Sequence, residues 1–389
     1  MKYERITFLD GLKGFACLGV FTHHFFLSFF PASYFGADAP SMTASGFDTW
    51  LSTEPYAFFL NGNFWVCLFL LISAFLLSGK IFALRESPSD QSFDRLSRMI
   101  LKRYLRLMIP AALIGILNYF LVILLNITNL NYMQEVNALS FPKLLYHAVI
   151  HMWIQVDSSV QGPFWMLHYL LFGSYLAILI ALATPIKSRW TPCIHLFLAV
   201  VMGICSRYYA GIVLGVMICY EYRYGKFLPY LIRETSQHAK LLRFATGSIL
   251  LLTGLFLGAY PSYVKPVNIY RIFNAYAFRD PDAYELIHCI GAACLLLSFF
   301  LLKGLASLFS TKPFLFIGKI SFSIYLIHGM LLKYLGYFTM HRLTEQIGNY
   351  SLAGSLTYLL LLIPLLLLSL ICFHTIERIG TVICKKLSL

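Results

Sequence analysis

Residues 9–30 read Leu-Asp-Gly-Leu-Lys-Gly-Phe-Ala-Cys-Leu-Gly-Val-Phe-Thr-His-His-Phe-Phe-Leu-Ser-Phe-Phe, and this stretch decides the fold class. It begins with the charged residues Asp10 and Lys13, and its second half is an apolar run long enough for a membrane helix. His23 and His24 lie within that run. An ionisable side chain at membrane depth is costly and normally faces a bundle interior or a water-filled cavity. The two histidines are therefore functional candidates.

The whole chain has the composition of a polytopic membrane protein. Hydrophobic residues make up 59% of the 389 residues and charged residues only 12%, whereas about 25% charged residues is typical of soluble domains. The net charge of +13 would suit a nucleic-acid binder, but the basic residues cluster in short connections between apolar runs, as orientation signals do. We expect an all-α membrane protein with a single integral-membrane domain over residues 1–389 and no nucleic-acid partner.

Ten apolar runs along the chain predict the helices of this bundle. With the N-terminus inside, the inner connections hold about three times as many lysine and arginine residues as the outer ones, which is the bias of a cytoplasmic side. The prediction is a bundle of about ten transmembrane helices with both termini cytoplasmic. The break at Ser206-Arg207-Tyr208 is either a tight turn or an interruption in one bent element. The runs fall near 11–31, 59–79, 105–127, 164–184, 193–206, 208–220, 244–260, 287–302, 317–337 and 354–373.

Three polar connections carry further signals. Residues 85–103 predict a short interfacial helix that feeds the third span, or a lipid-anchoring segment. In the outer segment 129–163, His147 and His151 stand four residues apart on a predicted surface helix, a spacing that can ligate a metal. Because no acidic or cysteine partner is evident nearby, we expect an amphipathic surface helix there and no metal. The outer segment 262–286 is rich in tyrosine and suits either a sugar or an interfacial aromatic belt.

Five stretches spread over almost the whole chain carry a family resemblance. In this order and spacing they resemble the acyltransferase-3 family of integral-membrane acyltransferases, in a free-standing version without a C-terminal esterase-like domain. The stretches are Ile6-Thr-Phe-Leu-Asp-Gly-Leu-Lys-Gly-Phe-Ala16 through His24, Asn61-Gly-Asn-Phe-Trp-Val-Cys-Leu-Phe-Leu-Leu-Ile-Ser-Ala-Phe-Leu-Leu-Ser-Gly79, Lys102-Arg-Tyr-Leu-Arg-Leu-Met-Ile-Pro110, Gly162-Pro-Phe-Trp-Met-Leu167 with Gly173-Ser174, and Gly318-Lys-Ile-Ser-Phe-Ser-Ile-Tyr-Leu-Ile-His328.

The sequence departs from the family pattern at three positions. Lys13 stands where the family usually has arginine, which keeps the charge but loses the bidentate fork. Ala74 replaces a common glycine, and Leu170 lies where many members carry a glutamate. No carboxylate role is available at that last position.

The resemblance implies transfer of an acyl group, often acetyl, from cytoplasmic acyl-CoA to a hydroxyl of a carbohydrate or other acceptor. His24, matched by its distance from Asp10, corresponds to the family's catalytic histidine. Lys13 takes the place of the arginine near the CoA phosphates. The basic residues of the third stretch complete the expected acyl-CoA contacts: Lys102, Arg103 and Arg106.

The spacing of Lys13 and His24 fits such a donor. The two residues are 11 positions apart, which on a helix is about three turns along one face and about 16 Å. A long anionic donor can keep its charged end at Lys13 while its reactive end reaches inward. Acyl transfer to a hydroxyl needs a base and a stabiliser of the oxyanion. We expect His24 to be the general base for direct attack, or to help form an acyl-enzyme; the alternative is a hydrogen-bonded core histidine.

Polar residues near the predicted helix ends are candidates for the cavity. Asp10 either caps the first helix or orients Lys13. Asn61 and Asn63 either bind the acceptor or cap a helix. Trp165 is either a stacking residue or an interface anchor.

The ninth apolar run carries a polar stripe. Ser321, Tyr325 and His328 stand at i, i+4 and i+7 and so share one helix face. They either line the cavity or join helices by hydrogen bonds.

The sequence therefore predicts a membrane O-acyltransferase that uses acyl-CoA, contacts membrane lipids and resides in a bacterial inner membrane. The alternative is a transporter or flippase of a lipid-linked or anionic solute, with His24 and Lys13 in the translocation path. CoA-dependent acyl transfer discriminates between the two, because a transporter moves its solute unchanged.

Overall fold

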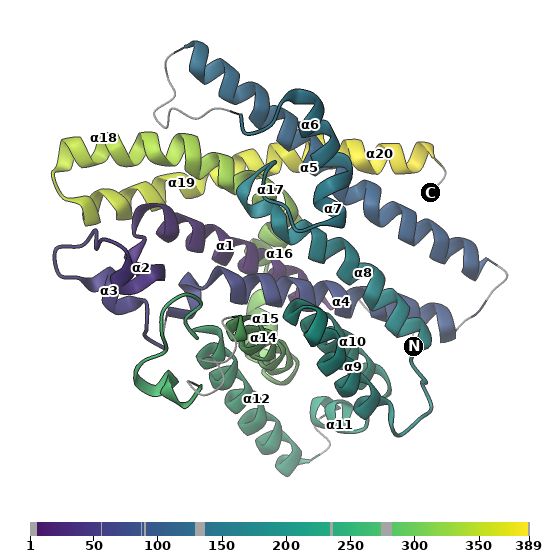
Figure 1. The fold of residues 1–389 in the computed structure, drawn as a ribbon. Helices are drawn as coiled ribbons and strands as arrows, with labels where there is room; N and C mark the ends of the chain where they lie inside the picture. The colour runs from purple at the N-terminus through teal and green to yellow at the C-terminus, as the bar shows by residue number, and fades with distance from the viewer. Residues whose placement is uncertain are drawn as a thin grey trace.

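The secondary structure of the described residues is helical (Figure 1). We analysed a computed structural model, which describes residues 6–55, 57–86, 88, 91–128, 137–233, 236–273 and 282–387. Helices account for 84% of it, and no strand occurs in these residues. The prediction of an all-α membrane protein is confirmed.

Six helices in the described part of the chain are long and apolar enough to cross a membrane, judged by length and composition. Two bent pairs raise the number to eight if each pair is one span. The first pair is α1 (Thr7–Phe29) with Ala32–Asp38, which begins with α2 (Ala32–Phe35). The second is α16 (Lys312–Lys319) with Ser321–Ile347, which begins with α17 (Ser321–Leu331). The six are α4 (Gly62–Glu86), α5 (Ser92–Ile127), α8 (Trp165–Ala183) preceded by η4 (Gly162–Phe164), α12 (Gln237–Gly258), α14 (Ala283–Leu301), and α19 (Tyr350–Cys372) continued by η7 (Phe373–Glu377) and α20 (Arg378–Lys386).

Every one of the ten apolar runs is helical, but fewer than ten meet the length and composition of a span. The fifth and sixth runs are α9 (Thr191–Cys205) and α10 (Arg207–Tyr224), which pack against each other. Ser206 separates them in an extended conformation, so the tight-turn interpretation holds. With 15 residues, α9 is shorter than the roughly 20 that a span usually needs. The location of both termini stays a prediction.

The polar segment before the third span is not a separate interfacial helix. α5 runs unbroken from Ser92 to Ile127 over 36 residues, which corresponds to about 54 Å. That length exceeds the roughly 30 Å of a hydrocarbon core. The basic first turns of α5 therefore extend the spanning helix beyond the apolar layer.

The predicted surface helix near residues 144–154 is present as α6 (Phe141–Tyr146), η3 (His147–His151) and α7 (Met152–Ile154). Residues 274–281 of the tyrosine-rich outer segment lie outside the described residues. The remaining short elements are η1 (Gly36–Asp38), α3 (Phe47–Leu51), η2 (Ala57–Leu60), α11 (Phe227–Arg233), η5 (Asn268–Phe273), α15 (Lys303–Phe309), η6 (Leu332–Gly336) and α18 (Tyr337–Ile347).

α1 lies in the middle of the bundle against α4, α16 and α17 (Figure 1). Its backbone touches that of α16 at two glycines. A Cβ atom at Gly318 would lie 2.1 Å from the carbonyl oxygen of Asp10, and one at Gly14 would lie 2.5 Å from the amide nitrogen of Gly318. Small residues at such crossings allow membrane helices to approach closely. The opening stretch is therefore central because glycine occupies both sides of this crossing.

Gly318→Ala should destabilise the fold, because its methyl group meets backbone atoms that cannot rotate away. Overpacking of this kind costs about 1–3 kcal/mol. Thermal unfolding in detergent, followed by size-exclusion chromatography, measures the effect. Gly304→Ala is the matched control, since a Cβ there meets nothing within 4 Å. Equal unfolding temperatures for the two variants would refute the close crossing.

Candidate functional site

A basic cavity of about 600 Å³ lies among α1, α4, α5, α8, α16, α17 and η7. It brings together the four residues expected to contact acyl-CoA, although one lies on α1 and the other three on α5. Four further cations and one carboxylate line the same cavity. The predicted residues are Lys13, Lys102, Arg103 and Arg106; the additional ones are Lys80, Arg95, Arg98, Lys319 and Glu377.

Arg103 is fixed in this basic cavity by hydrogen bonds to two other helices. Its Nε donates to Ser174 Oγ of α8 at 2.9 Å, and its Nη2 donates to Ser73 Oγ of α4 at 2.9 Å. A guanidinium carries five N–H donors, so donors remain for an anion. Arg103 therefore both joins three helices and presents a preorganised cationic group.

Lys13 is held by Asp10, one turn earlier on α1. Lys13 Nζ lies 2.9 Å from Asp10 Oδ1. The capping interpretation of Asp10 is wrong, because the residue before the helix is Ile6 and no side chain caps it. Asp10 instead orients the ammonium group at the edge of the basic cavity.

An aromatic cavity of about 540 Å³ lies towards the other end of α1. Its wall contains His24 and three more predicted residues, Asn63, Trp165 and Tyr325. Tyr263 belongs to residues 262–286, for which the sequence left a sugar site and an aromatic belt open, and Tyr34 comes from α2. The other ring-bearing side chains in the wall are His23, Phe35, Tyr169, Tyr208 and Tyr284.

A third cavity, here named the polar cavity, has a volume of about 510 Å³. Its wall includes amide, hydroxyl and ammonium groups from α5, η6 and residues 137–163. His24 and Pro163 line both the polar and the aromatic cavity. The His24 imidazole therefore stands where the two cavities adjoin. The polar side chains of the wall are Ser28, Asn118, Tyr119, Asn137, Ser158, Ser159, Gln161, Lys333 and Tyr337.

The imidazole of His24 lies between two other histidine rings. Its ring centroid is 5.0 Å from that of His23 and 5.1 Å from that of His328. His23 Nδ1 donates to the Leu60 carbonyl at 2.7 Å, so this nitrogen makes a structural hydrogen bond. His328 Nδ1 donates to the Tyr325 carbonyl at 2.7 Å. In the neutral ring Nε2 of His328 then carries a lone pair, and this buried atom has no hydrogen-bond partner among the described residues.

The polar stripe on α17 both lines cavities and joins helices, the two roles that the sequence left open. Ser321 lines the basic cavity, Tyr325 lines the aromatic cavity, and His328 contacts His24. The Tyr325 hydroxyl also donates to the Pro163 carbonyl, which ties α17 to η4.

Asn61 and Asn63 belong to a buried network around His288. Asn61 Nδ2 donates to the Tyr260 carbonyl at 2.6 Å, and Asn63 Nδ2 donates to His288 Nδ1 at 2.9 Å. Tyr208 donates its hydroxyl proton to Asn63 Oδ1 at 2.5 Å. Asn63 also lines the aromatic cavity, whereas Asn61 lines none of the three cavities described here.

Four helices line the basic cavity at one level and the aromatic cavity at another. α1 contributes Lys13 to the first and His24 to the second. The other three pairs follow the same order: Ser73 and Asn63 on α4, Leu170 and Trp165 on α8, and Ser321 and Tyr325 on α17. On α1, Lys13 and His24 are 11 residues apart, which corresponds to about 16 Å along the helix axis.

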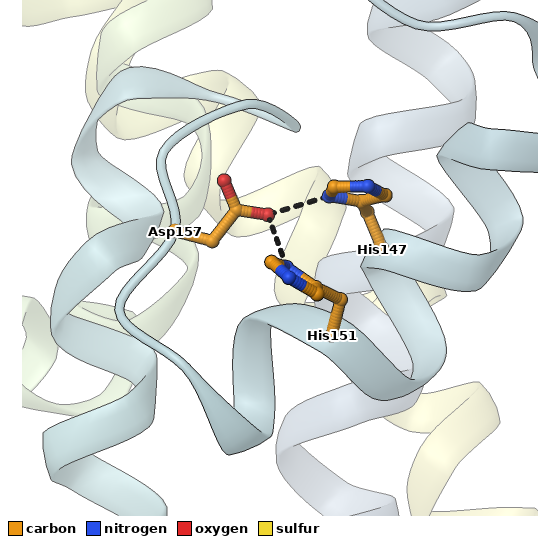
Figure 2. A group of neighbouring side chains, drawn as sticks. All are labelled: His147, His151 and Asp157. Atoms are coloured by element: carbon orange, nitrogen blue, oxygen red, sulfur yellow. Dashed lines mark hydrogen bonds and ion pairs between the residues drawn. The ribbon is translucent and has the colours of Figure 1, made fainter.

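The expectation that no acidic partner lies near His147 and His151 is wrong. Asp157 Oδ2 lies 2.7 Å from His147 Nδ1 and 3.1 Å from His151 Nδ1 (Figure 2). Burial alone would raise the pKa of Asp157, but hydrogen bonds from His147, Ser159 and His151 outweigh it and lower the pKa to about 2. The side chain is a carboxylate at neutral pH.

Fold and cavities define an integral-membrane protein with a cationic cavity at one level and a histidine among polar and aromatic groups at another. Over residues 6–374 the chain matches the acyltransferase-3 family, described as an acyltransferase domain. It belongs to this family and is a membrane acyltransferase. Neither curated proteins nor solved structures gave a significant match.

Proposed function

We propose that the protein is an O-acyltransferase of a bacterial inner membrane. It moves an acyl group from cytoplasmic acyl-CoA to a hydroxyl of a carbohydrate such as a cell-surface glycan precursor. Acetyl is the first candidate for this acyl group. This proposal rests on one observation, which is that the basic cavity and the aromatic cavity share four helices. The same four helices line a cationic cavity suited to a phosphorylated donor and a cavity with an imidazole suited to the chemistry.

The charges of the basic cavity favour CoA as the carrier of the acyl group. CoA bears several phosphate charges at one end and its thioester at the far end. Arginine binds phosphate through paired N–H groups, and lysine adds a mobile point charge. Arg103 is held ready by Ser73 and Ser174, so little ordering is needed when the donor binds.

The aromatic cavity favours a carbohydrate acceptor. Tyrosine and tryptophan offer an apolar ring face together with a polar group, and a sugar has apolar C–H faces and hydroxyl edges. Trp165, Tyr263 and Tyr284 supply such rings. Asn63 and Glu285 add hydrogen-bonding groups at the same wall.

His24 takes the proton of the acceptor hydroxyl in the proposed reaction. The hydroxyl oxygen forms a bond to the thioester carbonyl carbon, the carbon–sulfur bond breaks, and the sulfur leaves as CoA thiolate, which is then protonated. The products are the ester and free CoA. His328 can accept a hydrogen bond from one nitrogen of His24 through its lone-pair Nε2, so that the other nitrogen of His24 faces the acceptor.

His24→Ala should lower acyl transfer by about 10²–10⁴-fold, the usual contribution of a general base. Transfer of radiolabelled acetyl from acetyl-CoA in membranes with matched expression measures the loss. His238→Ala is the control, because that exposed histidine lies in the first turn of α12 and lines none of the three cavities. Full turnover by His24→Ala would exclude His24 as the base.

Lys13→Glu should raise the KM for acyl-CoA by about 10–100-fold, because a charge-assisted hydrogen bond contributes about 1.5–3 kcal/mol. The kcat should change less, since Lys13 is distant from the reacting atoms. Lys13→Arg should keep the wild-type KM.

Initial rates at varied acyl-CoA concentration separate the two constants. Lys187→Glu is the matched charge reversal at an exposed position on the same predicted side. If Lys13→Glu and Lys187→Glu give the same KM, the basic cavity does not bind the donor.

A further inference from the structure

The residues His147, His151 and Asp157 form a cluster outside the membrane-spanning helices. Both histidines belong to η3, and the carboxylate comes from the connection that follows α7 (Figure 2). Within the described residues this is the group of histidine, cysteine and acidic side chains whose ligand atoms all lie within 4.8 Å of one another. None of the three side chains lines a cavity described above.

The local backbone brings the two imidazoles together. Residues His147–His151 form a π-helical turn, which is wider than an α-helical turn and often occurs at functional sites. Residues four apart then lie nearly above one another. The two imidazole centroids are 4.4 Å apart with an angle of 39° between the rings.

Three hydrogen-bond donors converge on a single oxygen of Asp157. Oδ2 lies 2.7 Å from His147 Nδ1, 3.1 Å from His151 Nδ1 and 2.8 Å from Ser159 Oγ. The other oxygen, Oδ1, accepts the backbone N–H of Ser159 at 2.9 Å. This bond orients the carboxylate towards the imidazoles. A backbone or side-chain bond that orients a ligand is typical of metal sites.

We propose that His147, His151 and Asp157 bind a divalent transition-metal ion, with Zn²⁺ as the first candidate. The ligand atoms are Nδ1 of both histidines and Oδ2 of the aspartate, and Ser159 Oγ or a water molecule takes the fourth position. Two imidazoles and one carboxylate suit zinc, whereas calcium and magnesium prefer oxygen ligands alone.

The distances fit a tetrahedral site after a small adjustment. Zinc bonds of about 2.0–2.2 Å place neighbouring ligand atoms about 3.4 Å apart. The gap between His147 Nδ1 and Asp157 Oδ2 is 2.7 Å, so the two atoms separate by less than about 1 Å when the ion binds. Each histidine then carries its proton on Nε2 instead of Nδ1. The three side chains are 12–28% exposed, which gives the ion access from solvent.

The ion would fasten one wall of the polar cavity. The six residues that follow Asp157 directly, 158–163, all line that cavity together with His24. Val160 packs on α5, where a Cβ at Gly115 would lie 2.7 Å from its Cγ1. A metal bond from η3 to Asp157 joins the surface helix to this wall. The proposed role is structural and is independent of the proposed acyl transfer.

Metal analysis of the full-length protein, purified without a polyhistidine tag and treated with a chelator, tests the proposal. After addition of Zn²⁺ and removal of the excess, elemental analysis should find about one ion per chain. Zn²⁺ should raise the midpoint of thermal unfolding, because an ion that binds only the folded state stabilises it. Co²⁺ in place of Zn²⁺ should give visible absorption typical of a tetrahedral site.

Asp157→Asn and His151→Ala should each weaken Zn²⁺ binding by at least about tenfold, since even residues that only orient metal ligands contribute 10–100-fold. His341→Ala is the control: it removes an exposed histidine that lies 3.3 Å from Glu345, and should keep the ion. Zinc content near zero in the wild type, or equal content in wild type, Asp157→Asn and His151→Ala, would overturn the proposal. Should a variant not fold, the Co²⁺ spectrum of the wild type decides.

Discussion

Direct contact between the backbones of α1 and α16 is the constraint on which the site depends. With Gly14 and Gly318 at the crossing, no side chain separates the two helices. α1 can therefore lie in the middle of the bundle, with neighbours on several sides. That position places Lys13 in the basic cavity and His24 between the polar and aromatic cavities. A wider crossing would shift both side chains together.

Charge is separated along the helices that surround α1. The basic cavity collects lysine and arginine side chains from α1, α4, α5 and α16. At the level of His24 the walls are mainly aromatic, amide and hydroxyl groups. A phosphorylated donor and an uncharged acceptor hydroxyl would each meet a complementary surface, and His24 lies at the uncharged one. The physical separation of these surfaces suits a reaction between substrates from opposite sides of a membrane.

Much of the fold was predictable from the sequence, because hydrophobic runs and charge bias report directly on membrane helices. The grouping of Lys13 with Lys102, Arg103 and Arg106 came from the family resemblance, and spacing alone could not give it, since Lys13 lies on α1 and the other three on α5. Asp157 was missed for a related reason. Helical periodicity compares residues on one helix, whereas Asp157 reaches the histidines only because the chain folds back after α7. Asp10 was misassigned because α1 begins at Thr7, one turn earlier than a cap at Asp10 requires.

Sidedness of the reaction tests the central claim most directly. Proteoliposomes of known protein orientation are supplied with acyl-CoA on one face and a carbohydrate acceptor on the other, and the acylated acceptor is quantified by mass spectrometry. The account predicts ester formation when acyl-CoA is on the face of the basic cavity and the acceptor is on the opposite face, and little when the two are exchanged. Ester formation only with both substrates on the basic face, or passage of the unmodified acceptor across the membrane, would contradict it.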